Sequence, residues 1–199
     1  MSAATAAVGL ANRPSWRSRA IRAGAAASIT SGLIGLALAP VPEPYLAAWF
    51  RQPVMGPVLA AEHLLAVAGL IALLLSMACG EGLLSKAGIG MAVFGQLAWT
   101  PAEIIWRFSH PPANFLFELG LPLIAVGLII AGIGMLRARR WDGWQRFLPL
   151  ATGLYLPIVF LPAEALKFER GLAIGIWGIG FVLLGAAIWV REASPRRER

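Results

Sequence analysis

Residues 115–136 read FLFELGLPLIAVGLIIAGIGML and decide the fold class of this chain. Glu118 is the one ionisable side chain in this stretch, which reaches the roughly 20 apolar residues that a helix needs to cross ~30 Å of hydrocarbon. Five more stretches of similar composition occur, at about Ala23–Ala39, Val58–Cys79, Ala87–Trp106, Phe147–Leu166 and Leu172–Val190. The sequence therefore predicts an all-α, polytopic integral membrane protein with six transmembrane helices.

The overall composition supports the same fold class. Of the 199 residues, 58% are hydrophobic and 14% are charged, and the mean hydropathy is +0.72. Soluble domains have roughly half apolar and a quarter charged residues, and the same numbers exclude disordered, collagen-like, coiled-coil and disulfide-rich chains. The single cysteine, Cys79, cannot form an intramolecular disulfide. In a membrane protein, the net charge of +7 reflects where basic residues sit relative to the bilayer, so we expect the lipid bilayer as a partner and no nucleic acid.

The first apolar stretch has two interpretations. It follows a basic flank and ends in Ala37-Leu38-Ala39, which resembles the cleavage site of a signal peptide. Pro40 would follow the cut, however, and proline at that position is a poor substrate for the peptidase. We therefore favour a retained helix. The expected domains are a disordered basic tail at 1–22, a transmembrane domain at 23–190 and a basic tail at 191–199.

Basic residues are distributed unevenly between the two sides of such a bundle. With six spans, the two tails and the connections near Lys86 and at 137–146 share one side and hold thirteen Lys and Arg residues, whereas the opposite side holds four. The positive-inside rule then places both termini in the cytoplasm, in a multi-pass protein of the plasma membrane. Six carboxylates and both histidines, His63 and His110, fall on the extracytoplasmic side.

A short pattern recurs at an interval of about 60 residues. Pro101-Ala102-Glu103 closes the third span, Pro162-Ala163-Glu164 closes the fifth, and Pro40-Val41-Pro42-Glu43 closes the first. Three repeated helical hairpins would produce this pattern, but so would the ordinary occurrence of proline and glutamate at helix ends near water. The third helix must continue through Pro101 to reach spanning length, so we expect a kink there, and another at Pro162.

The candidate functional residues gather at the extracytoplasmic ends of the helices. Gln96, Thr100 and Glu103 are spaced i, i+4, i+7 and share a helix face. Ionisable residues at membrane depth are costly, so they are functional candidates by default, although a glutamate in the first turn of a span also meets the helix dipole favourably. The expected ligand-binding residues, in a vestibule lined by carboxylate, histidine and tryptophan, are Glu62, His63, Gln96, Trp99, Glu118, Tyr155 and Trp177.

Metal and cofactor motifs are not found in the sequence. His63 and His110 with nearby glutamates have the side-chain chemistry of zinc ligands, but no HExxH or CxxC spacing accompanies them. There is also no GxSxG motif, Walker loop or dinucleotide fingerprint. We therefore expect no metal and no cofactor.

The layout resembles the substrate-capture subunits of energy-coupling-factor transporters. Those proteins also combine about 200 residues, six spans, cytoplasmic termini and an outer ligand pocket. The resemblance implies a small-molecule binding, transport or assembly component with a partner subunit in the membrane, docked through small residues such as Ala23, Ala27 and Ser31. A pocket lined by glutamate and tryptophan would suit a cationic or aromatic small molecule.

A second resemblance concerns single motifs. Pro-Ala-Glu followed by aromatic residues is similar to the Pro-x-Glu pattern of small membrane-bound lycopene cyclases, and Trp99 with Glu103 resembles the Trp and Glu pair of membrane terpene cyclases. The number of spans and the flanking sequence depart from both families. The resemblance implies an intramembrane enzyme acting on a lipid or isoprenoid, with Glu103 or Glu164 as the catalytic general acid and Trp99, Trp177 and Tyr155 facing the cation.

Overall fold

The computed structural model describes residues 15–42, 45, 48–49, 51–106, 108–166 and 170–193, without the side chains of Ser15, Glu164 and Arg170. Within these ranges every regular element is helical, which confirms the all-α prediction. The first four long helices are α2 (Ser15–Leu38), α4 (Met55–Leu75), α5 (Leu83–Ile105) and α6 (His110–Ala138). A fifth pass is assembled from η1 (Trp144–Phe147), α7 (Leu148–Tyr155), η2 (Leu156–Phe160) and α8 (Leu161–Ala165), and the last helix is α9 (Arg170–Ala193).

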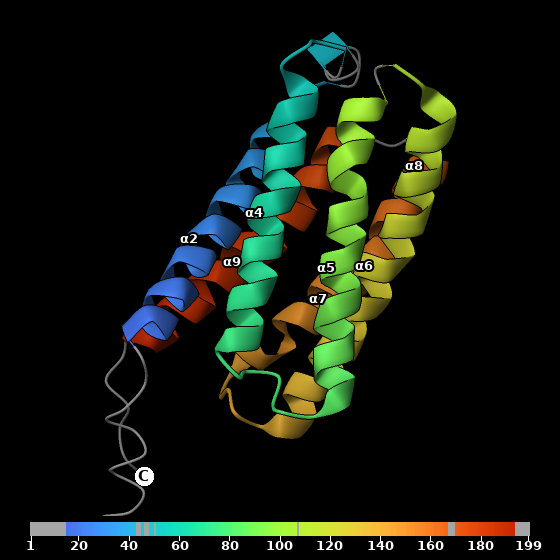
Figure 1. Cartoon of the computed structure of the whole chain (residues 1–199). Helices are drawn as coiled ribbons and strands as arrows, with labels where there is room; N and C mark the ends of the chain where they lie inside the picture. The colour runs from blue at the N-terminus through green and yellow to red at the C-terminus, as the bar shows by residue number, and fades with distance from the viewer. Residues whose placement is uncertain are drawn as a thin grey trace, which may run out of the picture.

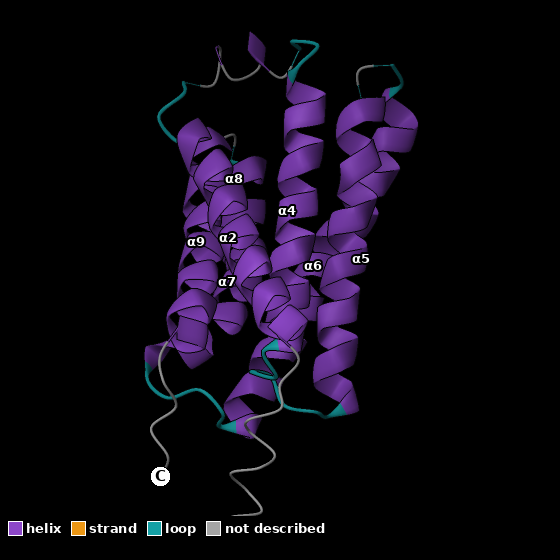
Figure 2. Ribbon diagram, turned by 60° about the vertical axis from the view of Figure 1, so that its left-hand side comes forward, coloured by secondary structure: helices purple, strands orange, loops and turns teal. Residues whose placement is uncertain are grey.

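These elements form a closed ring of antiparallel passes (Figure 1). Each helix packs against its neighbour in the chain, and α9 returns to pack along α2, while α4 also contacts α9 across the ring. The start of α2 and the end of α9 lie at the same end of the bundle as the connections at 76–82 and 139–143 (Figure 2). The core therefore lies between the helices, along the axis of the ring.

Five passes are long and apolar enough to cross a membrane: α2, α4, α6, the fifth pass and α9. The chain thus has the composition and fold of an integral membrane protein. α5 has the length of a span at 23 residues, but it carries Lys86, Gln96 and Glu103 and does not meet the same apolar standard. The expectation of six spans is therefore supported for five helices and left as a proposal for α5.

Glycines allow the helices to approach closely along two seams. On α6, a Cβ added to Gly127 would lie 2.5 Å from the backbone nitrogen of Ala92 on α5. On α9, a Cβ added to Gly178 would lie 2.6 Å from the carbonyl oxygen of Gly32 on α2. Both distances are far inside van der Waals contact, so only glycine fits. Small residues at such positions are the usual basis of helix packing in membranes, where apolar side chains gain little by leaving lipid.

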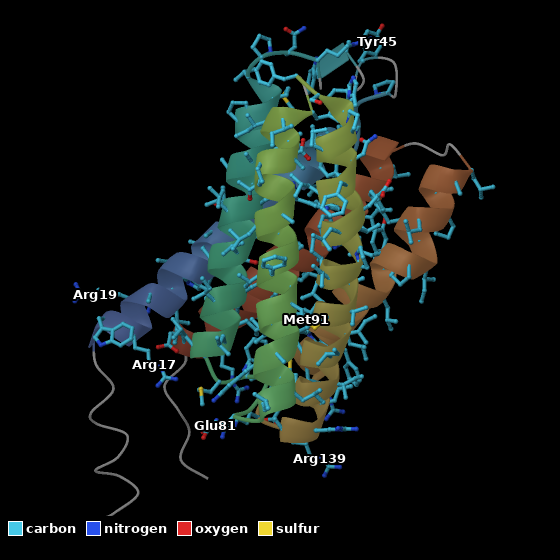
Figure 3. The ribbon with its side chains drawn as sticks, turned by 45° about the vertical axis from the view of Figure 1, so that its right-hand side comes forward. Arg17, Arg19, Tyr45, Glu81, Met91 and Arg139 are labelled. Atoms are coloured by element: carbon cyan, nitrogen blue, oxygen red, sulfur yellow. The ribbon has the colours of Figure 1, made fainter. Side chains whose placement is uncertain are left out.

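One end of the bundle is basic, and we call it the basic end: it comprises the start of α2, the end of α9 and the connections at 76–82 and 139–147. Figure 3 shows Arg17, Arg19, Glu81 and Arg139 at this end, with Tyr45 at the other. The Arg17 guanidinium donates to the carbonyl oxygen of Leu75 through Nη2 at 2.7 Å and Nε at 3.2 Å. A cation on a free carbonyl of the last helical turn also meets the negative end of the helix dipole. The basic end is therefore capped by its own arginines.

The prolines have different effects in the fifth pass and in α5. α5 continues through Pro101 to Ile105, as the length argument required. In the fifth pass the distortion is a π-helical turn, Leu156–Phe160, with Pro157 near its start. Proline removes one backbone hydrogen bond, and widening the turn is one way for a helix to accommodate the loss.

The first helix is longer than the sequence predicts. It begins at Ser15 rather than at Ala23, so residues 15–22 extend it beyond the apolar stretch. The three-hairpin repeat stays a prediction, because Glu43 and the side chain of Glu164 lie outside the described residues.

Candidate functional site

A polar cluster lies inside the ring, at the junction of α2, α4 and α5. Its members are Ser31 on α2, Glu62 and His63 on α4, and Gln96 and Glu103 on α5, and we call it the His63 cluster. Glu62 and His63 lie roughly 10–12 Å along α4 from Met55, and Gln96 lies ~14 Å from the last residue of α5, at 1.5 Å per residue. The cluster is therefore buried at depth, on the side of the bundle away from the basic end.

Glu62 connects α4 to α2. The Ser31 hydroxyl donates to Glu62 Oε1 at 2.6 Å, and both residues are buried. The second oxygen of the same carboxylate, Oε2, lies 3.0 Å from Nδ1 of His63. One carboxylate thus accepts from a hydroxyl on one helix and faces an imidazole on its own helix.

His63 connects α4 to α5 through both ring nitrogens. Nδ1 lies 2.9 Å from Oε1 of Gln96, and Nε2 lies 3.5 Å from Oε1 of Glu103. The second distance is within ion-pair range, but the geometry is not that of a hydrogen bond. The imidazole is 4% exposed, while the Glu103 side chain is 20% exposed. Glu103 is therefore more exposed than the imidazole that it faces.

The contacts of His63 define the roles of its two nitrogens. Nδ1 faces two oxygen acceptors, those of Glu62 and Gln96, so it carries a proton. Nε2 is then the nitrogen that gains or loses a proton when the ring titrates, and it faces Glu103. The arrangement places the second ring nitrogen of His63 within ion-pair distance of a carboxylate on the neighbouring helix.

Aromatic rings continue from the cluster into the core. The rings of His63 and Trp99 meet edge to face with centroids 5.2 Å apart. Trp99 also contacts Phe117 and Trp177, both at 5.8 Å, and Trp177 contacts Phe181 at 5.3 Å. Edge-to-face pairs of this kind are worth roughly 0.5–1.5 kcal/mol each beyond their buried area. The indole nitrogen of Trp99 donates to the Phe117 carbonyl at 3.0 Å, which fixes the ring that touches His63.

Three buried nitrogen atoms in this region have no hydrogen-bond partner among the described residues: Nε2 of His63, Nε2 of Gln96 and Nε1 of Trp177. Gln96 is completely buried, and Trp177 is 6% exposed. A buried donor without an acceptor costs roughly 1–3 kcal/mol. Three such groups therefore leave the hydrogen bonding around the cluster incomplete among the described residues.

The structure brings together four of the predicted ligand-binding residues and one predicted acid. Glu62, His63 and Gln96 join Glu103 in the cluster, and Trp99 contacts it directly. Trp177 is linked to it only through Trp99.

Other candidates lie apart from the cluster. Glu118 is exposed on α6. Tyr155 donates to the carbonyl oxygen of Ala173 at 2.8 Å, which joins α7 to α9. The Thr100 hydroxyl bonds to the Gln96 carbonyl on its own helix. His110 is exposed and packs on Trp106, and the Glu164 side chain is outside the described residues.

Ser31 is the member of the cluster that sequence reasoning assigned differently. It was expected to belong to a small-residue docking face with Ala23 and Ala27, whereas in the structure it is buried and Ala23 is exposed. A hydroxyl in the middle of an apolar helix was the available signal, but serine serves close helix packing as often as hydrogen bonding.

Among the described residues, no group of three or more His, Cys, Asp or Glu side chains is arranged to hold a metal ion. No protein-family model, curated protein or solved structure matches the chain. The function must therefore be inferred from the fold and the cluster.

Proposed function

We propose that this chain is a six-span plasma-membrane protein, with both termini in the cytoplasm, that binds or transports a small cationic solute in exchange for a proton at the His63 cluster. The observation that carries the proposal is the position of His63 inside the bundle, between the carboxylates of Glu62 and Glu103. A partner subunit, as in the transporters that the layout resembles, belongs to the same proposal.

The surface of α5 supports its assignment as the sixth span. Its large exposed apolar side chains are Leu83, Leu84, Phe94, Leu97 and Ile104, whereas Gln96 is completely buried. A helix with apolar residues outside and polar residues inside is suited to lipid around it and a polar interior beside it. The buried position of Gln96 and the apolar outer surface support a membrane position for α5.

The cost of burying the cluster supports a functional role. Taking carboxylates and an imidazole out of water costs several kcal/mol per ion, and well-packed apolar residues are often equally stable or more so. Burial of this cluster is therefore not an efficient way to stabilise the fold. In membrane proteins, chains of Glu and His inside the bundle mark pathways for protons and ions.

The charge of the cluster favours a cationic solute. Two carboxylates face one imidazole, and Glu103 is the more exposed of the two. A cation that binds beside Glu103 replaces the positive charge of the proton on Nε2 of His63, and that proton is released to water. The total charge of the cluster is then unchanged, so the exchange avoids the cost of adding a net charge to the membrane interior.

Proton exchange can be tested in reconstituted vesicles. The purified protein is inserted into liposomes with an acidic lumen and a fluorescent pH-gradient probe, and sodium, lithium, potassium and tetraethylammonium are added outside in turn. We expect at least one cation to dissipate the gradient with the wild-type protein. His63→Gln and Glu103→Gln should each reduce this rate by at least tenfold. This is a lower bound, because loss of one general acid or base slows an enzyme roughly 10²-fold or more.

Glu118→Gln is the matched control, because it removes a carboxylate from the exposed surface of α6. Its rate should equal that of the wild type. Absence of cation-dependent proton movement with the wild-type protein would count against exchange, and equal loss in all three variants would show a general charge effect rather than a site.

An intramembrane enzyme is the second candidate, favoured by the contact between His63 and Trp99 at the start of the aromatic run. In this proposal Glu103 protonates an alkene or epoxide of a lipid or isoprenoid, and Trp99 and Trp177 stabilise the resulting cation. Native mass spectrometry after purification in mild detergent separates the candidates. A retained isoprenoid mass that Trp177→Ala abolishes would favour the enzyme, and a retained polar cation that Glu103→Gln abolishes would favour exchange.

A further inference from the structure

An apolar groove opens on the outer surface of the bundle between α2 and α9. It has a volume of about 390 Å³ and is lined by Ala26, Ile29, Thr30, Ala186, Trp189 and Val190. This size is within the roughly 300–1,000 Å³ of ordinary ligand pockets. The one hydroxyl in its wall, that of Thr30, donates to the Ala26 carbonyl at 3.0 Å, so its only donor is already used. The groove is therefore suited to a hydrocarbon chain.

Two arginines stand at the end of this groove that is nearer the basic end. Arg22 and Arg19 precede Ala26 on α2 by four and seven residues, spacings that place them on the same helix face. Both side chains are exposed, and neither has an ion pair or side-chain hydrogen bond within the part of the chain that the structure describes. Figure 3 shows Arg19 at the end of α2, directed away from the bundle.

The other arginines nearby are already engaged. Arg17 caps α4 through the Leu75 carbonyl, and Arg191 bonds to the Arg140 carbonyl and lies over the Trp141 ring. One carboxylate, Glu192, lies on α9 one turn beyond Trp189. The open end of the groove thus presents two cations without partners against a single acid, beside a tryptophan of the kind that marks membrane interfaces.

We propose that this groove binds an anionic phospholipid of the leaflet at the basic end, with one acyl chain along α2 and α9 and the phosphate against Arg19 and Arg22. The apolar wall of the groove suits the acyl chain of such a lipid, and the two unpaired arginines at one end suit its phosphate. A second copy of this chain fits less well, because a symmetric contact through the groove would bring the two arginines of each copy together. Like charges so placed repel each other, and the lipid neutralises them.

The test is a competition between two lipids with the same acyl chains. The protein is equilibrated with equimolar phosphatidylglycerol and phosphatidylcholine, and bound lipids are counted by native mass spectrometry at low salt. We expect the wild type to retain phosphatidylglycerol preferentially. Arg19→Gln and Arg22→Gln should each lower the preference about fivefold and together about 25-fold, since each basic residue near an anionic surface contributes a factor of about five.

Two further variants separate the groove from general charge attraction. Lys86→Gln with Arg137→Gln removes the same charge from exposed positions of α5 and α6 at the same end of the bundle, and it should leave the preference within twofold of the wild type. Ala26→Phe with Ala186→Phe fills the groove and should reduce occupancy by both lipids. Each variant must elute and melt as the wild type does.

Three results would overturn the proposal. The first is an unchanged preference in the double arginine variant, and the second is equal loss in the Lys86 and Arg137 control. The third is a lipid-free dimer that the Ala26 and Ala186 variant dissociates, which would assign the groove to a second copy.

Discussion

The basic end and the His63 cluster both contain charged side chains, but the fold accounts for them differently. At the basic end, Arg17 meets a helix-terminal carbonyl, and Arg140 pairs with Glu81 at 3.1 Å on the exposed surface. Position at a helix end and beside water is enough to explain these charges. In the cluster, Glu62 and His63 lie two turns inside a membrane helix, and three nitrogen atoms nearby have no hydrogen-bond partner among the described residues. The contrast teaches that a charge needs a functional explanation only where solvent and helix ends do not supply a structural one.

The largest effect is expected from removing one member of the cluster. His63→Leu leaves Glu62 and Glu103 without their cation, and breaking a buried pair in this way costs roughly 3–5 kcal/mol. For a chain of this length, this corresponds to a fall in Tm of about 6–20 °C. Thermal unfolding in detergent, followed by tryptophan fluorescence, measures it.

Replacing all of the cluster together should have the opposite result. An apolar version carries Ser31→Ala, Glu62→Met, His63→Leu, Gln96→Met and Glu103→Met. We expect its Tm to equal or exceed that of the wild type, because no charge remains buried without a partner. A Tm as low as that of His63→Leu would show that the cluster is structural, like the charges of the basic end.

A further prediction concerns Cys79, which is buried in the connection at the basic end. Burial raises the pKa of its thiol to about 12. Because thiolate is the reactive form, and because its intrinsic reactivity rises only partly as the pKa rises, maleimide labelling at pH 7.5 should be about fiftyfold slower than for an exposed cysteine. Glu81→Cys in a Cys79→Ala background is the control, since residue 81 is exposed two positions further on.

The same shift has a consequence for stability. The folded chain keeps Cys79 protonated to a higher pH than the unfolded chain, whose thiol has a pKa near 9.0. The free energy of unfolding should therefore fall as the pH rises from about 9 towards about 12, and Cys79→Ala should remove that part of the dependence. Rapid labelling of the native thiol would show that the basic end is open to water.

A smaller effect is expected at Arg17. Arg17→Gln removes two hydrogen bonds to the Leu75 carbonyl and a favourable charge at the end of α4. The loss should be about 1–2 kcal/mol, the scale of a charged hydrogen bond or a cation at a helix C-terminus. Arg19→Gln, two residues further along the same helix, should lower the Tm much less. Equal shifts would mean that net charge, rather than the cap, stabilises this end.

The smallest effect is expected at the exposed pair of Arg140 and Glu81. Glu81→Gln should cost less than about 1 kcal/mol, and 0.5 M salt should remove most of that difference, because water and ions screen exposed pairs. Chemical denaturation at two salt concentrations measures both quantities. A cost near that of His63→Leu would remove the distinction between the two regions.

The helices could be predicted from the sequence more completely than their contacts. Apolar length predicted the five passes that are long and apolar enough to cross a membrane, since it depends only on residues close together in the chain. The polar residues Gln96 and Glu103 of α5 are explained by their contacts with His63 on α4, which the sequence of α5 does not contain. Helix faces were also predicted, and Gln96 and Glu103 do share one. The rotation of α6, however, is fixed by its glycine seam with α5 around Gly127, and that rotation leaves Glu118 at the surface.

The pairing of Ser31 with Glu62 depends in the same way on information that no single helix contains. It requires α2 and α4 to be neighbours at one particular register. Spacing along one helix cannot supply the axial offset between two helices. The sequence therefore predicted which residues of α4 and α5 were candidates, but not which hydroxyl would complete the site.

Glu62 and His63 are consecutive residues, and consecutive residues on an α-helix point about 100° apart around its axis. Because of this angle, α4 reaches α2 through one residue and α5 through the next. α4 cannot turn about its own axis without breaking a hydrogen bond to one neighbour or the other. Its angular position is thus held from two sides by polar contacts, so Glu62 and His63 together fix the rotation of α4 as well as its position along the axis.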